Sequence, residues 1–252
     1  LDRILQDDDI EIDAISGTSA GALNGAALKA GMVAGGREGA RANLQWFWEK
    51  VGAITDERWQ DWLSELTPNA HMFAKALEYS PAYQAIDFTT KLFSPYSFGA
   101  AVRNPLDPIV RDMRFDDICC DTGPELNICA TNVRTGKIRV FDTTEVSPEV
   151  LMASACLPSL FQAVEFEDPR TGQTEAFWDG GYTGNPALYP LFTNDLPDDI
   201  LVVNINPLYR EELPMDRQSI ENRVNEISFN SPWFREHRPI NLITRVPAEG
   251  AL

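Results

Sequence analysis

A five-residue segment, Gly-Thr-Ser-Ala-Gly at residues 17–21, constrains the fold more than any other feature of the sequence. Residues 10–16 before it alternate apolar and polar side chains, which predicts a strand. Residues 20–30 after its centre are rich in Ala and Leu, which predicts a helix that Gly31 ends. The chain is therefore expected to open as a strand, a tight turn and a helix.

The same segment fits the pattern G-x-S-x-G, in which a catalytic serine lies at the corner between a strand and a helix. At such a corner the Ser19 side chain projects outward. Gly17 and Gly21 are expected there because a Cβ would not fit between the strand and the helix. The positive end of the helix dipole points at the same spot and favours a developing oxyanion. A strand-to-helix corner that needs glycines only for packing would show the same pattern. The predicted strand before residues 17–21 and the predicted helix after them favour a nucleophile.

A nucleophilic serine needs a proton acceptor within hydrogen-bond reach, and histidine is the usual one. The chain has two histidines. His71 lies in an aromatic-rich helical stretch, and we interpret it as structural. His237 lies among charged residues, but it follows Asp179 and gives the chain order Ser, Asp, His of α/β-hydrolases. That fold places several strands before its nucleophile, whereas one predicted strand precedes Ser19, so a His237 triad stays an alternative only.

Asp179 is the other candidate base. A carboxylate bonded directly to a serine can take its proton if the site is dry, although a reference pKa of about 3.9 otherwise makes aspartate a weak base. Gly180 and Gly181 follow Asp179 and permit a tight turn with close approach of the backbone. An Asp-Gly pair is also an ordinary turn signal, so this motif alone does not identify a base.

Strand-like and helical patterns are interleaved along the rest of the chain, which predicts an α/β fold with a largely parallel sheet. The run Ile200–Ile205 is continuously apolar, as expected of a strand buried on both faces. Ser147 and Pro148 fit the N-cap and first position of a helix. No linker or repeat divides the sequence, so residues 1–252 are expected to form one domain. The other predicted elements are strands at 126–130 and 137–141, a hairpin of 163–166 with 175–178 about residues 168–172, and a helix at about 216–229.

Composition and charge argue against several classes of function. The chain has 38 acidic and 21 basic residues, a formal net charge of −17, which argues against nucleic acid as a partner. No run of 18 or more apolar residues is present, so no membrane span is expected. Cys119, Cys120, Cys129 and Cys156 lack the spacing of metal ligands and favour a reduced compartment. We therefore expect no metal site and a protein of the cytoplasm or of a membrane surface.

Residues 130–132 (Ala-Thr-Asn) and 226–231 (Glu-Ile-Ser-Phe-Asn-Ser) resemble stretches common in bacterial patatin-like phospholipases. Two motifs together resemble those of the same family. They are residues 17–24 (Gly-Thr-Ser-Ala-Gly-Ala-Leu-Asn) and Asp179 with the two glycines after it. A third block, residues 153–158 (Ala-Ser-Ala-Cys-Leu-Pro), is also similar. The resemblance implies a three-layer sandwich with a mostly parallel central sheet and helices on both faces. It also implies a Ser-Asp dyad without a catalytic histidine, in which Ser19 is the nucleophile and Asp179 the base.

From this resemblance we expect a lipid acyl hydrolase of the phospholipase A or esterase type. It would cleave carboxylic esters through an acyl-enzyme, without a cofactor, and its partner would be a lipid or other acyl ester, with peripheral membrane contact. The family carries a glycine-rich oxyanion loop, which would lie upstream of Leu1, and the Ala20 N–H is expected to assist it. The many aromatic residues between Trp46 and Phe98 fit a cap for acyl chains, although core packing is the commoner use of such residues.

Three other functions remain as alternatives. The first is an esterase or thioesterase with a triad of Ser19, Asp179 and His237. The second is a binding module that holds a phosphate at the helix N-terminus within residues 17–25. This segment, however, has neither G-x-x-x-x-G-K-[ST] nor G-x-G-x-x-G. The third is a catalytically silent scaffold of the same fold.

Overall fold

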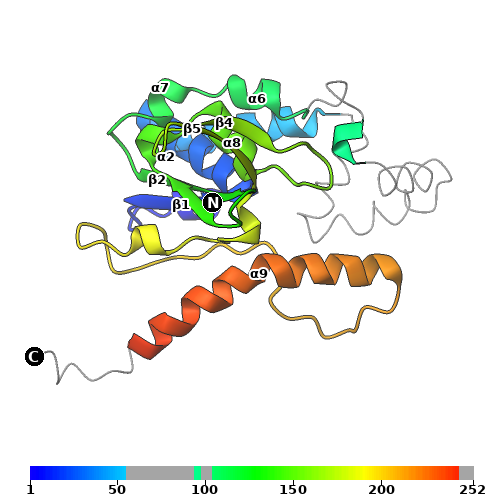
Figure 1. The fold of residues 1–252 in the computed structure, drawn as a ribbon. Coiled ribbons are helices and arrows are strands. Elements are labelled where there is room, and N and C mark those ends of the chain that lie inside the picture. Colours follow the sequence, from blue (N-terminus) through cyan, green and yellow to red (C-terminus); the bar gives the residue numbers. More distant parts are fainter. Residues whose placement is uncertain (55–93, 98–103, 244–252) are drawn as a thin grey trace, which may run out of the picture.

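The computed structural model describes residues 1–54, 94–97 and 104–243, and Figure 1 shows its fold. His71 and most of the aromatic stretch between Trp46 and Phe98 lie outside the described residues. The elements in chain order are α1 (Asp2–Leu5), β1 (Ala14–Thr18), α2 (Ala20–Gly52), α6 (Asp107–Arg111), α7 (Phe115–Ile118), β2 (Glu125–Asn132), β3 (Ile138–Phe141), η2 (Thr143–Glu145), α8 (Pro148–Ser154), β4 (Val164–Asp168), β5 (Gln173–Asp179), η3 (Gly180–Tyr182), η4 (Tyr189–Leu191) and α9 (Arg217–Ile243).

The described strands form one mixed sheet with β2 at its centre. β1 is parallel to β2, whereas β3 and β5 are antiparallel to β2 and β4 is antiparallel to β5. The predicted hairpin about residues 168–172 is confirmed, and Gly172 supplies its turn with a φ of 65°. The predicted N-cap is also confirmed, because Ser147 Oγ accepts the Val150 N–H at 3.3 Å in front of α8.

Helices and sheet are arranged in layers (Figure 1). α2 packs on β1 and β2, α8 packs on β2, β4 and β5, and α6 and α7 lie outside them. On the other side of the sheet, α9 packs against η3, where the ring centroids of Tyr182 and Phe229 are 5.1 Å apart. This arrangement confirms the expected three-layer α/β sandwich. The expectation of a mostly parallel sheet is wrong for the described strands, because β1 and β2 are parallel whereas the other three described pairs are antiparallel. Within the described residues, no helix is long and apolar enough to cross a membrane.

The main hydrophobic core lies between the helices and the sheet. Its fully buried members include Leu23 of α2, Leu126 and Ile128 of β2, Leu151 of α8 and Phe177 of β5. Three residues at the start of the aromatic stretch belong to the same core. Phe47 is completely buried, and Trp46 and Trp48 pack partly buried against it. Residues 46–48 therefore serve core packing, whereas Tyr96, which is also described, is 59% exposed.

The first long helix extends beyond its predicted end at Gly31. α2 continues to Gly52 through a kink, where Gly35 and Gly36 leave helical geometry and Gly36 has a φ of 61°. The two halves approach closely, since a Cβ on Gly31 would lie 2.4 Å from the carbonyl oxygen of Gly39. Gly31 thus permits close packing between the halves, a use of glycine that the sequence does not distinguish from helix termination. Two further boundaries differ: β1 begins later than residue 10, and α9 continues past residue 229.

The prediction of a doubly buried strand at Ile200–Ile205 is wrong. This run forms no strand, and Leu201 and Val203 are 68% and 60% exposed. Among the described residues β1 pairs with β2 alone. The apolar residues of the run 200–205 line a groove of about 1610 Å³ together with β1 residues. Because no described strand lies beside the run, its backbone has no ladder partner in the part of the chain that the structure describes.

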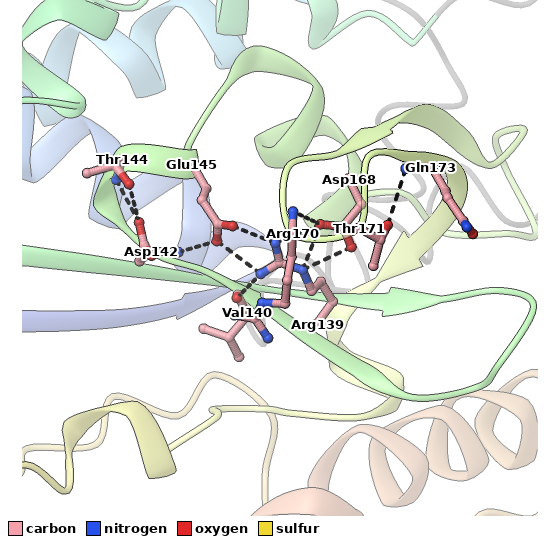
Figure 2. Close-up of polar contacts among 9 residues, drawn as sticks. All are labelled: Arg139, Val140, Asp142, Thr144, Glu145, Asp168, Arg170, Thr171 and Gln173. Carbon is pink, nitrogen blue, oxygen red and sulfur yellow. Dashed lines mark hydrogen bonds and ion pairs between the residues drawn. The ribbon is translucent and has the colours of Figure 1, made fainter.

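An ion-pair cluster fixes the turn end of the β4–β5 hairpin to β3, as Figure 2 shows. Arg139 of β3 is buried, and its Nη2 lies 2.7 Å from Asp168 Oδ1 and 2.7 Å from Glu145 Oε1. Its guanidinium carbon lies 4.1 Å from the centroid of the Phe141 ring. The cluster joins β3, η2 and β4, so it anchors the hairpin at the end opposite to Asp179.

Candidate active site

The register of the sheet brings Ser19 and Asp179 together. Thr18, the last residue of β1, pairs with Cys129 of β2, and Asp179, the last residue of β5, pairs with the next β2 residue, Ala130. β3 occupies the other side of β2 at both positions. β1 and β5 therefore lie on the same side of β2 and meet end to end, with Ser19 directly after β1.

Ser19 has a strained backbone. Its φ is 55° and its ψ is −123°, and among the described residues it is the one non-glycine residue with a positive φ. Conformations of this kind cost about 1–3 kcal/mol and cluster at functional sites. Ser19 caps α2, and its carbonyl accepts the Ala22 N–H at 3.0 Å. This is the geometry expected of a serine at a strand-to-helix corner.

The two glycines around Ser19 differ in what they permit. A Cβ on Gly17 would lie 2.6 Å from the Gly21 carbonyl oxygen and 2.8 Å from Ala22 Cα, so the strand needs glycine here. A Cβ on Gly21 would meet no atom within 4 Å. The expectation that close packing requires both glycines is therefore wrong for Gly21, which lines the groove beside β1. Neither Ser19 nor Asp179 lines that groove.

Asp179 is completely buried and has one oxygen without a partner. Its Oδ1 accepts the Gly181 N–H at 2.7 Å, whereas Oδ2 has no hydrogen-bond partner among the described residues. Its backbone is fixed on both sides: the N–H donates to Cys156 O at 2.8 Å, and the carbonyl accepts Thr131 Oγ1 at 2.8 Å. A fixed carboxylate with an open oxygen in a dry site is suited to accept a proton.

Burial raises the pKa of Asp179 to about 7, and the Ser19 hydroxyl and the Gly181 N–H oppose this shift. Because the Ser19 hydroxyl lowers the pKa of Asp179, it is close enough to the carboxylate to interact with it. Oδ2 nevertheless makes no hydrogen bond of ordinary geometry among the described residues. Catalytic hydrogen bonds are often long or poorly aligned without substrate and tighten in the complex. A base with a pKa near 7 is both basic enough to act and substantially ionised at neutral pH.

Close contacts explain the two glycines after Asp179. A Cβ on Gly180 would lie 2.2 Å from the Cys129 carbonyl oxygen, and one on Gly181 would lie 2.2 Å from Phe229 Cε1. The pair therefore lets the end of β5 pack tightly against β2 and α9.

The other predicted site residues take different places. Ala20 is the first residue of α2, and the N–H of a first helical residue has no acceptor within the helix. His237 lies in α9, and His71 lies outside the described residues. In the described ranges, no group of three or more His, Cys, Asp and Glu side chains could hold a metal ion.

Two contacts at the junction of β1 and β5 escaped the sequence analysis. Ser154 Oγ accepts the Ser19 N–H at 3.0 Å, and Cys156 O accepts the Asp179 N–H at 2.8 Å. Both residues belong to the block 153–158, which the sequence singled out by similarity without giving it a role. The available signal was a cluster of small side chains at the end of a short helix.

This fold and this pair of side chains agree with the resemblance seen in the sequence. The family model of the patatin-like phospholipases matches residues 1–192, a range that includes both Ser19 and Asp179. The chain therefore belongs to the patatin-like phospholipase family, whose members are hydrolases that act on lipid esters. A comparison with curated protein sequences finds no match.

Proposed function

We propose that the protein hydrolyses carboxylic ester bonds of lipids, as a phospholipase A or esterase, through a dyad of Ser19 and Asp179. The observation that supports this most is the buried Asp179 carboxylate, with Oδ2 open, at the junction where Ser19 begins α2. A buried carboxylate without a cation or full hydrogen bonding destabilises a fold, so a purely structural role explains it poorly.

In the proposed mechanism, Asp179 accepts the Ser19 Oγ proton while Oγ attacks the ester carbonyl carbon. The tetrahedral intermediate collapses, the bond to the leaving alcohol breaks, and Asp179 returns its proton to that alcohol. The acyl group is then esterified to Ser19. Asp179 next takes a proton from water, whose oxygen attacks the acyl carbonyl. The carboxylic acid departs as Ser19 regains its proton, and the sum of both halves is hydrolysis of one ester.

The N-terminus of α2 supports the charged intermediate in this proposal. The Ala20 N–H and the positive end of the helix dipole lie next to Ser19, where the oxyanion develops. Both act without reorganisation, because the backbone at this corner is already fixed by the sheet and the helix.

The substrates of the family are lipids, and we propose contact with a membrane surface from the cytoplasmic side. Exposed apolar side chains support this contact, among them Leu201, Val203, Leu213 and Met215. Sedimentation with zwitterionic lipid vesicles tests it, and protein that remains wholly in the supernatant would contradict it.

Labelling of the full-length protein with a fluorophosphonate tests the dyad. Wild type should be labelled, Ser19→Ala should not, and Asp179→Asn should react far more slowly. Ser159→Ala and Asp112→Asn are matched controls because both side chains are exposed, and both variants should label like wild type. Labelling that persists in Ser19→Ala, or that is absent from folded wild type, would remove the hydrolase proposal.

A further inference from the structure

A short segment at the end of α8 contacts the backbones of both dyad residues. The Ser154 hydroxyl accepts the Ser19 N–H at 3.0 Å, and two residues later Cys156 O accepts the Asp179 N–H at 2.8 Å. Ser154 and Cys156 are both buried. The segment thus ties the end of β1 to the end of β5 at the place where the two strands meet.

The Ser154 hydroxyl acts both as a hydrogen-bond acceptor and as a hydrogen-bond donor. It accepts the Ser19 N–H and donates to Cys129 O at 2.7 Å, so its proton and one lone pair have fixed partners. Cys129 is the β2 residue that pairs with Thr18, and its carbonyl oxygen is also the atom that a Cβ on Gly180 would strike. Ser154 therefore fixes Ser19 against the same point of β2 that the end of β5 touches.

These partners are unusual for a serine at the end of a helix. A buried helical serine commonly bonds the carbonyl of the preceding turn. The partners of Ser154 instead lie 135 and 25 residues away in the chain. They also meet a specific need, because Ser19 has a positive φ and a buried N–H without a partner would add to that strain.

We propose that Ser154 is a positioning residue for the dyad. Its hydroxyl holds the Ser19 backbone in the strained conformation in which Oγ faces Asp179, while Cys156 holds Asp179 in place. This inference rests on the proposed function of Ser19 and Asp179. It adds a residue whose role lies in the geometry of the nucleophile and not in contact with the substrate.

Kinetics of three variants on a soluble p-nitrophenyl ester test the role. Ser154→Ala should lower kcat by about 10- to 100-fold and leave KM within about twofold, because small displacements of a reacting group reduce the rate without changing substrate contacts. Ser154→Thr keeps the hydroxyl and should recover most of the lost kcat. Ser147→Ala is the matched control: it removes a hydroxyl that also accepts a backbone N–H, at the other end of α8. It should lower the melting temperature without changing kcat.

Amide hydrogen exchange at Ser19, followed by NMR, gives a second measurement that does not depend on turnover. The Ser19 N–H should exchange slowly in wild type and in Ser147→Ala, and much faster in Ser154→Ala. If Ser154→Ala changes only the melting temperature, with kcat and Ser19 exchange as in wild type, Ser154 is merely structural and the inference is wrong. A wild type that no fluorophosphonate labels would instead contradict the dyad, and the exchange rates would still show whether Ser154 holds Ser19.

Discussion

The β4–β5 hairpin carries a buried aspartate at each of its ends, and the two have opposite surroundings. Near the turn, Asp168 accepts Arg139 Nη2 at 2.7 Å and the Arg170 N–H at 3.0 Å (Figure 2). At the far end, Asp179 has one backbone donor and one oxygen without a partner among the described residues. The hydrogen bonds from Arg139 hold the pKa of Asp168 below its usual value, whereas burial raises the pKa of Asp179 to about 7.

The comparison shows that the hydrogen-bond and charge partners of a buried aspartate, more than its burial, set its basicity. Asp168 is buried and compensated, so its charge supports a structural cluster and its basicity is low. Asp179 is buried and uncompensated, so it retains affinity for a proton at neutral pH. Both aspartates lie on one hairpin. Substitutions at the Asp179 end should therefore change the activity, and substitutions at the Asp168 end should change the free energy of unfolding.

Asp179→Asn should have the largest effect on activity. It removes the proton acceptor while it keeps the shape of the side chain, so kcat should fall on the order of 10³-fold or more. The fold should remain, because no ion pair in the described ranges involves this carboxylate and asparagine can still accept the Gly181 N–H. Ester hydrolysis and circular dichroism of the same preparation check the prediction. Activity above about a tenth of wild type would show that another group is the base.

Removal of Arg139 should act on stability instead. Arg139→Met leaves the buried Asp168 and the partly buried Glu145 without their cation, and the loss of one partner of a buried ion pair typically costs about 3–5 kcal/mol. Urea denaturation should show this decrease in the free energy of unfolding. The double variant Arg139→Met/Asp168→Leu should recover part of it, because the uncompensated charge of Asp168 is gone. Specific activity per folded molecule should change little in both, in contrast to Asp179→Asn.

The stability of the protein should depend on pH with opposite signs at the two ends. Asp179 stays protonated in the folded state up to about pH 7, whereas its ordinary value is 3.8, so the folded state binds more protons between these values. Its contribution to stability therefore falls as the pH rises from about 4 to 7, by up to about 1.4 kcal/mol per pKa unit. Asp168 has a lowered pKa, so its contribution is present above pH 4 and is lost as the pH falls through its folded pKa.

Denaturation series across this pH range check both signs. The free energy of unfolding of Asp179→Asn, relative to that of wild type, should increase as the pH rises from 4 to 7. Asp168→Asn should instead be less stable than wild type above pH 4, and this difference should shrink at lower pH. The pH profile of kcat should also rise through about pH 7 in wild type, since the ionised Asp179 is the base. An activity that is flat from pH 5 to 9 would argue that Asp179 does not titrate during turnover.

His237→Ala should have the smallest effect. An aspartate with a pKa near 7 needs no histidine to act as a base, so kcat/KM should stay within about twofold of wild type. A triad esterase would instead lose most of its activity in this variant. Comparison of His237→Ala with Asp179→Asn therefore distinguishes a dyad from a triad in one assay.

The sequence determined the features that depend on near neighbours. The strand, corner and helix around Ser19, the hairpin about residues 168–172 and the N-cap at Ser147 all follow from local periodicity, small residues and capping chemistry. The two motifs that carry Ser19 and Asp179 were also visible, because each has glycines at fixed offsets in the sequence.

Features that depend on segments far apart in the chain became visible in the folded structure alone. The sequence placed an interior strand at Ile200–Ile205, but a strand needs a neighbour, and no described strand lies beside this run. Gly31 resembled a helix end because the Gly39 carbonyl that requires it lies in the next helical segment. The pairing of Ser19 with Asp179 likewise comes from the β2 register, and the raised pKa of Asp179 comes from burial that the whole fold creates. Local chemistry thus specified the two side chains, whereas packing and desolvation gave them a common site.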